Sequence, residues 1–295
     1  LTALDIIFFK KKQKIYKYFP LYFGFRDPEK FFNENYKDQN YLEWNKIHNI
    51  KNQELIPKIE KKKNSIVVFV KDINFHNLVA EGSLHQCADI ENYRESFNLL
   101  LKNNYSIERV GDATHKEFKF QDKNFTDNTK KNFSQKDQYI SYLKSEFYFG
   151  CSGSSFHYSS FFNKPNIVSN ASLDYLWNPQ INFTKKDLII FKKVFCKKSN
   201  KILSFEEIFN LDLEYLENYD NFSFIENSKS EIYQLTEVFI DLNQNNNYTN
   251  FSMTEKFNDL LKIFNKKNLE KSTKFKIYDS SYYMVPNFFL EKYLY

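Results

Sequence analysis

Arginine is rare in this chain, so each arginine is a candidate for chemistry that lysine cannot perform. Lysine and arginine together number 42, but only Arg26, Arg94 and Arg109 are arginines. A guanidinium is planar and permanently charged, and its typical partners are carboxylates and phosphates. Arg109 is followed by Gly111 and Asp112 in the stretch SIERVGDATH. We expect Arg109 either to bind an anionic ligand or to brace the end of a strand, and composition does not separate these two roles.

A run of small residues, FGCSGSSFHYSSFF, is a second candidate site. It places Gly150, Ser152, Gly153 and Ser154 between an expected strand and an expected helix. Backbone N–H groups at such a turn, together with the positive end of a helix, can bind phosphate. A tight turn is the simpler interpretation, because the spacing matches neither the Walker loop nor GxGxxG. A serine hydrolase that uses Ser152 or Ser154 with His157 is an alternative, which the mismatch to GxSxG does not favour.

Ionisable side chains near expected strand ends are candidates for acid–base chemistry. Asp72 follows the apolar run IVVFV, and His85 precedes the next expected helix. Either could act as a general base in a cleft at that edge. A solvated or hydrogen-bonding role is the simpler interpretation for a single histidine, and helix capping is the simpler one for Asp112.

Two pairs of charged residues in the second half could contact a nucleotide. Glu206 could reach a ribose, although an exposed helix glutamate is the simpler interpretation, and Glu207 already has a structural role in a capping box. Lys192 and Lys193 could reach a diphosphate. Solvated lysines are slightly favoured as the explanation of that pair.

These residues need a scaffold, and the chain alternates between strand-like and helix-like segments. Apolar runs predict strands over 66–70, 105–110, 146–150 and 166–170. Helical spacing predicts helices over 89–104, 137–145 and 154–163. This alternation is typical of an α/β fold with a Rossmann-like parallel sheet and helices on both faces, in which ligands bind at the carboxyl ends of strands.

The second half of the chain is expected to add further elements. Residues 188–196 are predicted as one extended segment and 222–226 as a strand. Helices are predicted to begin after Ser204 and Ser228, because each is followed by glutamate at the spacing of a capping box. The polar stretch 243–250 predicts a linker.

Composition limits the classes of protein. The chain has 295 residues, of which 42% are hydrophobic and 19% aromatic, so it is not a disordered protein. The net charge of +5 is modest and lacks a basic stripe, which argues against nucleic acid as a partner. The cysteines Cys87, Cys151 and Cys196 are far apart in sequence and predict neither a disulfide framework nor a metal site. A reducing, cytoplasmic setting is expected.

The N-terminal region is expected to belong to a larger domain. The chain begins with Leu1, which we interpret as the start of a fragment. We expect residues 1–60 to be the remnant of an N-terminal domain and a linker, 61–243 to be the Rossmann-like domain, and 244–295 to be a tail that packs back on it. The aromatic and lysine-rich segment 4–25 could rest on an anionic membrane surface, although a solvated lysine face is favoured.

Several sequence blocks in a fixed order carry a resemblance to a known family. The blocks VVFVKD, ADIENY, RVGD, FYFGCSGSS, FNKPNIVSN and KILSFEEIF resemble a bacterial family of glycosyltransferases with the GT-B arrangement, found among surface-polysaccharide genes. The resemblance covers roughly residues 62–242. It implies a C-terminal Rossmann-like domain with a pocket for a nucleotide-sugar donor. The residues that it assigns to this pocket are Arg109, Gly111 and Asp112, then Gly150, Ser152, Gly153 and Ser154, and then Asp89, Asn92 and Tyr93.

The resemblance also implies an activity. A sugar would pass from the donor to a glycan or lipid-linked acceptor, without a cofactor and without a metal, because GT-B enzymes generally offset the diphosphate charge with helix N-termini and basic side chains. The chain departs from the family at Lys71 and Gln86, where arginines are usual, so Arg109 would be the main guanidinium of the pocket. Asp72 and His85 are the candidate bases. A non-catalytic nucleotide- or glycan-binding domain is the main alternative.

Overall fold

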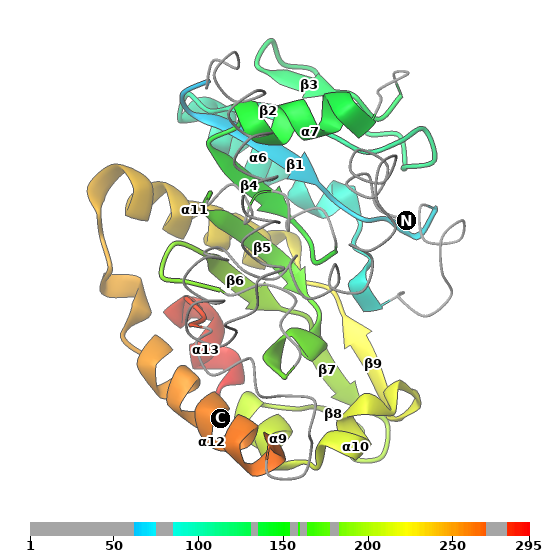
Figure 1. Ribbon diagram of the computed structural model, residues 1–295, viewed down its shortest axis with the longest axis vertical. Helices are drawn as coiled ribbons and strands as arrows, with labels where there is room; N and C mark the ends of the chain where they lie inside the picture. The colour runs from blue at the N-terminus through cyan, green and yellow to red at the C-terminus, as the bar shows by residue number, and fades with distance from the viewer. Residues whose placement is uncertain are drawn as a thin grey trace, which may run out of the picture.

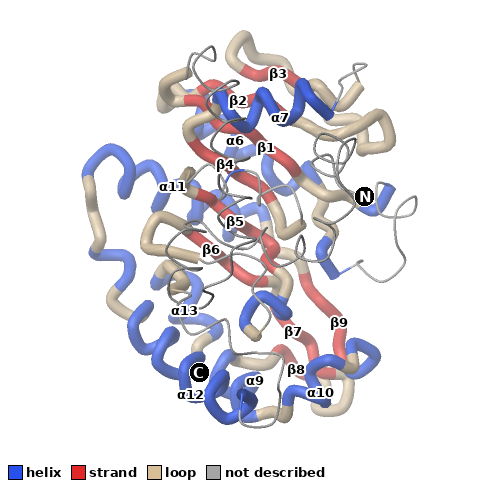
Figure 2. Tube along the Cα trace, in the orientation of Figure 1, coloured by secondary structure: helices blue, strands red, loops and turns tan. Residues whose placement is uncertain are grey.

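The computed structural model describes residues 62–74, 85–130, 135–153, 159, 164–177, 183–269 and 282–295. The expected remnant at 1–60, Ser154, His157 and nearly all of the helix expected over 154–163 lie outside the described residues. In the described part, two sheets follow one another along the molecule, and helices surround them (Figures 1 and 2).

The larger sheet has six parallel strands in the order β3-β2-β1-β4-β5-β6. Its strands are β1 (Ser65–Phe69), β2 (Ser106–Arg109), β3 (Phe125–Asp127), β4 (Phe147–Gly150), β5 (Asn166–Ala171) and β6 (Leu188–Phe191). The four strands predicted in the first half are adjacent, which confirms the predicted Rossmann-like parallel sheet. The strand order reverses between β1 and β4, as in doubly wound nucleotide-binding folds.

The central strands owe their position to uninterrupted apolar sequence. Ile66, Val67 and Val68 of β1 are each at most 1% exposed. A strand that is buried on both faces needs such a run, whereas a half-exposed strand alternates apolar and polar residues. The sequence SIVVF therefore fits only the middle of a covered sheet.

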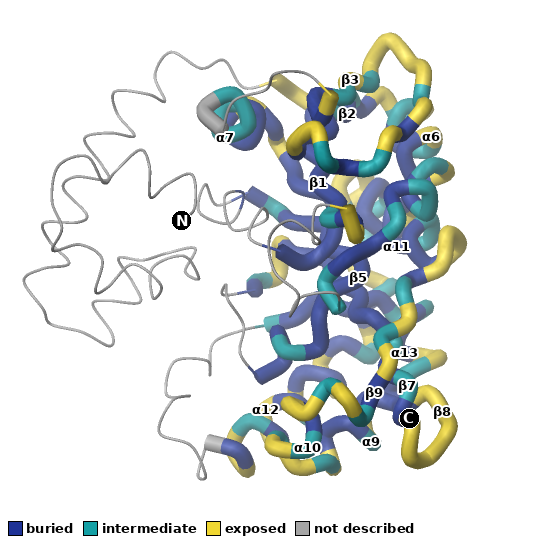
Figure 3. The backbone as a smooth tube through the Cα atoms, turned by 90° about the vertical axis from the view of Figure 1, so that its right-hand side faces the viewer, coloured by how far each residue is buried: buried dark blue, intermediate teal, exposed yellow. Residues whose placement is uncertain are grey.

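Helices cover both faces of this sheet, as predicted (Figure 3). On one face, α6 (Arg94–Lys102) packs against α11 (Lys229–Asn245), and α7 (Gln135–Lys144) lies on the opposite face against β1. Both predicted capping boxes are present, at Ser204 and Ser228. The helix predicted from residue 89 begins as a 3-10 turn, Ile90–Tyr93, whose cap is the Asp89 side chain.

The smaller sheet corrects one expectation. Residues 188–196 are not a single extended segment, because the chain leaves β6 at Lys192 and continues as β7 (Lys193–Cys196) in an antiparallel sheet. The neighbours of β7 are β8 (Lys201–Ile202) and β9 (Phe222–Ile225), so the predicted strand at 222–226 belongs to this sheet. The Lys192 N–H still bonds to Ala171 O of β5 at 2.9 Å, and this bond marks the end of the parallel pairing.

An aromatic cluster lies below β6. It joins α9 (Phe205–Asn210), α12 (Thr254–Leu269) and the segment before α13 (Asn287–Tyr293). The Phe257 ring of α12 lies 5.0 Å from that of Phe205 and 6.1 Å from that of Phe191. Met284 forms a parallel bridge with Leu188, so the C-terminal segment extends the edge of the large sheet. Shorter elements are η5 (Leu173–Leu176), α10 (Leu213–Glu217), η6 (Tyr219–Asn221) and η7 (Thr249–Phe251).

Candidate functional site

A crevice is expected at the carboxyl ends of β1 and β4, because the strand order of the parallel sheet reverses between these two neighbouring strands. Gly150 ends β4 so close to β1 that a Cβ atom there would overlap the carbonyl oxygen of Phe69. Gly153 has a φ of +151°, and among the described residues the nearest atom to a Cβ there would be Cδ of Lys71 at 4.0 Å. The two glycines therefore bring the strands together and leave room beside Lys71.

Two lysines contact the loop that crosses this edge. Lys71 follows β1 and donates from Nζ to Oε1 of Gln86 at 3.0 Å. Lys192 follows β6, is 4% exposed and donates from Nζ to the carbonyl oxygen of Cys87. Burial lowers the pKa of both ammonium groups below their usual value. Among the described residues Lys192 forms no ion pair, and that one hydrogen bond uses one of its three donor hydrogens.

The neighbouring thiols do not balance this positive charge. Cys151 accepts a hydrogen bond from the Lys71 N–H at 3.0 Å, and burial raises the pKa of its thiol to about 12. Burial also raises the pKa of the Cys87 thiol. Both cysteines are therefore neutral at physiological pH. The charge of Glu226 favours the ionised form of Lys192. Its Oε2 atom, however, accepts hydrogen bonds from Asp89 N at 2.9 Å and from Asn92 Nδ2 at 3.2 Å.

Asp72 and His85, the two candidate bases, both lie near the crevice. Asp72 is 3% exposed, and its carboxylate accepts backbone N–H bonds from Asn74 at 3.0 Å and from Lys116 at 2.6 Å. It therefore ties the loop after β1 to the loop after β2. The His85 ring packs edge-on against Tyr219 with their centroids 4.7 Å apart.

Arg109 is held by groups of the chain itself. Its side chain is fully buried, with Nη1 2.8 Å from Oδ2 of Asp127 and Nη2 2.9 Å from the carbonyl oxygen of Lys116. Asp127 ends β3, so the guanidinium joins two neighbouring strands and the loop that connects them. Of the two roles left open by the sequence, this geometry corresponds to bracing a strand end.

The loop after β2 is a compact turn around His115. The Asp112 N–H donates to Nδ1 of His115 at 3.1 Å, and a Cβ atom at Gly111 would lie 2.8 Å from the same ring. The Asp112 carboxylate accepts from Thr114 N at 2.9 Å. Burial lowers the pKa of His115, so the ring is neutral near pH 7. Gly111 and Asp112 thus shape this loop.

The three candidates of the ADIENY block have different surroundings. Asp89 caps the 3-10 turn by accepting from Glu91 N at 3.1 Å and pairs with Lys116 at 2.8 Å. Asn92 binds Glu226 as described above. Tyr93 is fully buried, and its hydroxyl lies 2.7 Å from Oγ of Ser169. Asp89 and Asn92 thus border the loop that carries Cys87, and Tyr93 is part of the core.

Ser152 is also fully engaged inside the protein. Its hydroxyl donates to the carbonyl oxygen of Asn170 and accepts from Ser172 N, each at 3.2 Å, and its side chain is fully buried. These bonds join the turn after β4 to the end of β5. The geometry gives no support to Ser152 as a nucleophile.

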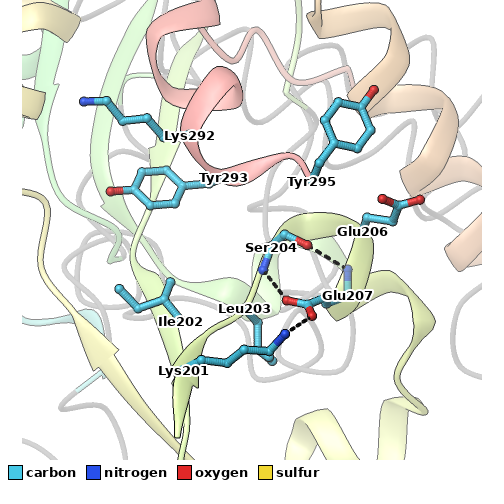
Figure 4. A pocket seen from close by; sticks show the side chains of 9 residues that line it. All are labelled: Lys201, Ile202, Leu203, Ser204, Glu206, Glu207, Lys292, Tyr293 and Tyr295. Carbon is cyan, nitrogen blue, oxygen red and sulfur yellow. Dashed lines mark hydrogen bonds and ion pairs between the residues drawn. The ribbon is translucent and has the colours of Figure 1, made fainter. Parts of the chain in front are cut away.

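Glu206 lies apart from these residues, in an open pocket of about 560 Å³ (Figure 4). The Glu206 N–H donates to the carbonyl oxygen of Leu294 at 3.0 Å. Below Glu206, Lys201 pairs with Glu207, which closes the capping box on Ser204. No other candidate of the nucleotide site lines this pocket, whose walls are Lys201, Ile202, Leu203, Ser204, Glu206, Glu207, Lys292, Tyr293 and Tyr295.

The sequence did not single out Asp174, although it lies at the same edge of the sheet. It follows β5 by three residues, on η5. Its Oδ1 atom is buried without a hydrogen-bond partner in the described part of the chain, and burial raises the pKa of its carboxyl. A sequence signal was present, because Asp174 follows a predicted strand at its carboxyl end.

Comparison of the chain with known protein families, with curated proteins and with solved structures finds no match. Within the described ranges, no cluster of three His, Cys, Asp or Glu side chains is placed to hold a metal ion. None of the helices described here combines the length and the hydrophobicity needed to cross a bilayer.

Proposed function

We propose that the chain is a glycosyltransferase that binds the diphosphate of a nucleotide-sugar donor in the crevice between β1 and β4. The observation that carries the proposal is a pair of lysines whose pKa values are lowered by burial: Lys71 follows β1 at the reversal of the strand order, and Lys192 reaches the loop after β1 from the end of β6. Ligands of doubly wound sheets bind at this position.

The energetics of the two ammonium groups favour an anionic ligand. Burying a positive charge costs free energy unless an anion compensates for it. Perturbed ionisable groups in such a position are typical of functional sites, because a ligand supplies the compensation. The space beside Gly153 lies next to Lys71. Fixed positive charges there would stabilise the diphosphate as it leaves the sugar, with no need for a metal ion.

The nature of the reaction follows from the sequence blocks that resemble GT-B glycosyltransferases. They support a glycan or a lipid-linked acceptor of surface-polysaccharide synthesis, and a cytoplasmic enzyme that meets its acceptor at the inner membrane surface. The resemblance assigned the diphosphate contacts to Arg109. In this proposal Lys71 and Lys192 make those contacts in its place. A non-catalytic nucleotide-binding domain would use the same crevice, and only donor turnover separates the two functions.

Calorimetry with UDP, GDP and dTDP tests the proposal. We expect at least one of them to bind, and Lys192→Met to weaken that binding at least tenfold, which is about 1.4 kcal/mol. The ligand-free melting temperature of Lys192→Met should not fall, because the variant no longer buries a charge. Lys262→Met is the matched control, since the Lys262 side chain is 60% exposed. Equal affinity in Lys192→Met and the control would refute the assignment of the diphosphate to this crevice.

A further inference from the structure

Asp174 lies beside the proposed diphosphate site and belongs to none of the contacts described above. The Ser172 N–H bonds to Oγ of Ser152, so the start of η5 is fixed to the turn after β4. That turn continues into Gly153, which borders Lys71. Asp174 is therefore one strand away from the crevice, at the same carboxyl edge.

The surroundings of Asp174 leave a carboxylate without a counter-ion. In the part of the chain that the structure describes, no lysine, arginine or histidine pairs with it, and Oδ1 has no donor. The ionisable groups near it are the phenols of Tyr175 and Tyr219, whose pKa values are raised by burial and further by its negative charge. The Ser172 hydroxyl is beside it and favours its ionised form.

A series of contacts leads from Asp174 around the crevice to the lysines. Tyr219 packs against His85, the residue before Gln86, and Gln86 accepts the hydrogen bond of Lys71. Asp174 follows β5, and the two lysines follow β1 and β6, so all three residues lie at the carboxyl edge of the large sheet.

We propose that Asp174 is the catalytic base of the glycosyl transfer, a role that rests on the proposed function. One carboxylate oxygen takes the proton of the acceptor hydroxyl, and the acceptor oxygen forms the new bond to the anomeric carbon. The bond from that carbon to the diphosphate breaks, and its electron pair leaves with the diphosphate, whose charge Lys71 and Lys192 stabilise. Asp174 ends the step protonated and the nucleoside diphosphate is released.

The other candidate bases are less suited to take a proton. Both oxygens of Asp72 already accept backbone N–H bonds, from Asn74 and from Lys116, and these bonds hold two loops together. The ring of His85, the other candidate, packs edge-on against Tyr219 with the ring centroids 4.7 Å apart. No donor among the described residues occupies Oδ1 of Asp174, and burial raises the pKa of its carboxyl, which makes it a better proton acceptor than an exposed carboxylate.

Stability separates this role from a structural one. Because burial raises the carboxyl pKa in the folded chain, the free energy of unfolding falls as pH rises from the usual pKa toward the raised value, and the full penalty is present above the raised pKa. Asp174→Asn removes the buried charge and should leave the melting temperature unchanged or higher. A carboxylate that served to hold η5 in place would give the opposite result, a lower melting temperature.

The experiment measures three properties of Asp174→Asn, Asp174→Glu and the control Asp259→Asn, whose side chain is 66% exposed. They are the affinity for UDP, GDP and dTDP, the melting temperature, and the release of nucleoside diphosphate from a panel of UDP-, GDP- and dTDP-sugars with water as acceptor. We expect Asp174→Asn to reduce kcat at least 100-fold, with affinity within twofold of the parent chain and no loss of melting temperature. Asp174→Glu should retain more turnover than Asp174→Asn.

The outcomes distinguish this inference from the proposed function. If the parent chain binds and turns over a donor while Asp174→Asn keeps its turnover, Asp174 is not the base and the transferase stands. If turnover and melting temperature fall together in Asp174→Asn without recovery in Asp174→Glu, the residue is structural and the inference is wrong. If the parent chain binds none of the three nucleoside diphosphates, or binds them without turning over any donor, both the transfer reaction and the base are refuted.

Discussion

Single residues of one chemical type serve different purposes in this chain, and their neighbours decide which. Lys192 and Lys193 are adjacent in sequence, yet Lys192 reaches the loop over the carboxyl edge while Lys193 pairs with Glu231 at 2.7 Å in a buried ion pair. The sequence could name both as candidates but could not separate them, because that choice depends on the bend between β6 and β7. The bend in turn depends on partners distant in sequence.

Arg109 is a residue whose importance the sequence indicates but whose partner it does not reveal. Its rarity correctly indicates a need for a guanidinium, and the partner is a carboxylate. The sequence does not reveal that this carboxylate is Asp127, because β3 is only three residues long and carries little strand signal. Rarity of a residue type therefore predicts a geometric demand and not a ligand.

Arg109→Lys tests this role directly. Lysine keeps the charge but cannot donate to Asp127 and to the Lys116 carbonyl at the same time from a planar group. We expect the free energy of unfolding to fall by about 1–3 kcal/mol, the scale of hydrogen bonds to charged groups, with UDP affinity unchanged. Urea unfolding and calorimetry on the same samples measure both. Weakened nucleotide binding at unchanged stability would return Arg109 to the binding site.

At the scale of elements, the four central strands of the large sheet could be predicted, whereas the pairing of the small sheet could not. Parallel strands buried on both faces favour apolar runs, and those of β1 and β4 are visible in the sequence, whereas β5 shows only the pair Ile167 and Val168. The small sheet contains β8, which has two exposed residues and no apolar signal. It forms because β7 and β9 meet, 26 residues apart at the pair Cys196 and Phe222, which is a tertiary event.

Hydrogen bonds from a side chain of one element to the backbone of another also could not be predicted from the sequence. Lys164 is 7% exposed and donates to the carbonyl oxygens of Tyr142, Leu143 and Ser145 at the end of α7. A lysine before a strand would ordinarily be interpreted as solvated. Its actual role depends on how α7 lies on the sheet, so no local pattern could predict it.

Gly150→Ala probes the junction of β4 with β1. The added methyl group would overlap the Phe69 carbonyl, which is backbone and cannot move without separating the two strands. We expect a loss of more than 3 kcal/mol in unfolding free energy, beyond the range of ordinary substitutions, or no soluble protein. Gly153→Ala is the comparison, because a Cβ there has room and meets only the strain of its positive φ, about 1–3 kcal/mol. Equal losses in thermal melts would contradict the close approach of the strands.

At the scale of the whole molecule, the question is whether the two sheets unfold together. We expected the part after residue 243 to be a tail that packs back on the Rossmann-like domain. In the structure Phe257, which is fully buried, packs against Phe191 of the large sheet and Phe205 of α9. Met284 continues this contact along the edge of β6. Continuous packing of this kind favours a single cooperative unit.

Phe257→Ala tests that cooperativity, with Ile263→Ala on the same helix as its control. Phe257 is fully buried and Ile263 is 67% exposed, so removal of the Phe257 ring should cost about 3–5 kcal/mol and removal of the Ile263 side chain much less. Because Phe257 contacts Phe191, this loss should shift the unfolding of the large sheet as well. Trp177 contacts Phe264 of α12, so in a Trp44→Phe background its fluorescence reports on the packing of α12, and far-UV circular dichroism reports on the whole chain. Coincident shifts of the two transitions support one unit, whereas a shift in fluorescence alone would mean that α12 and its neighbours unfold independently of the large sheet.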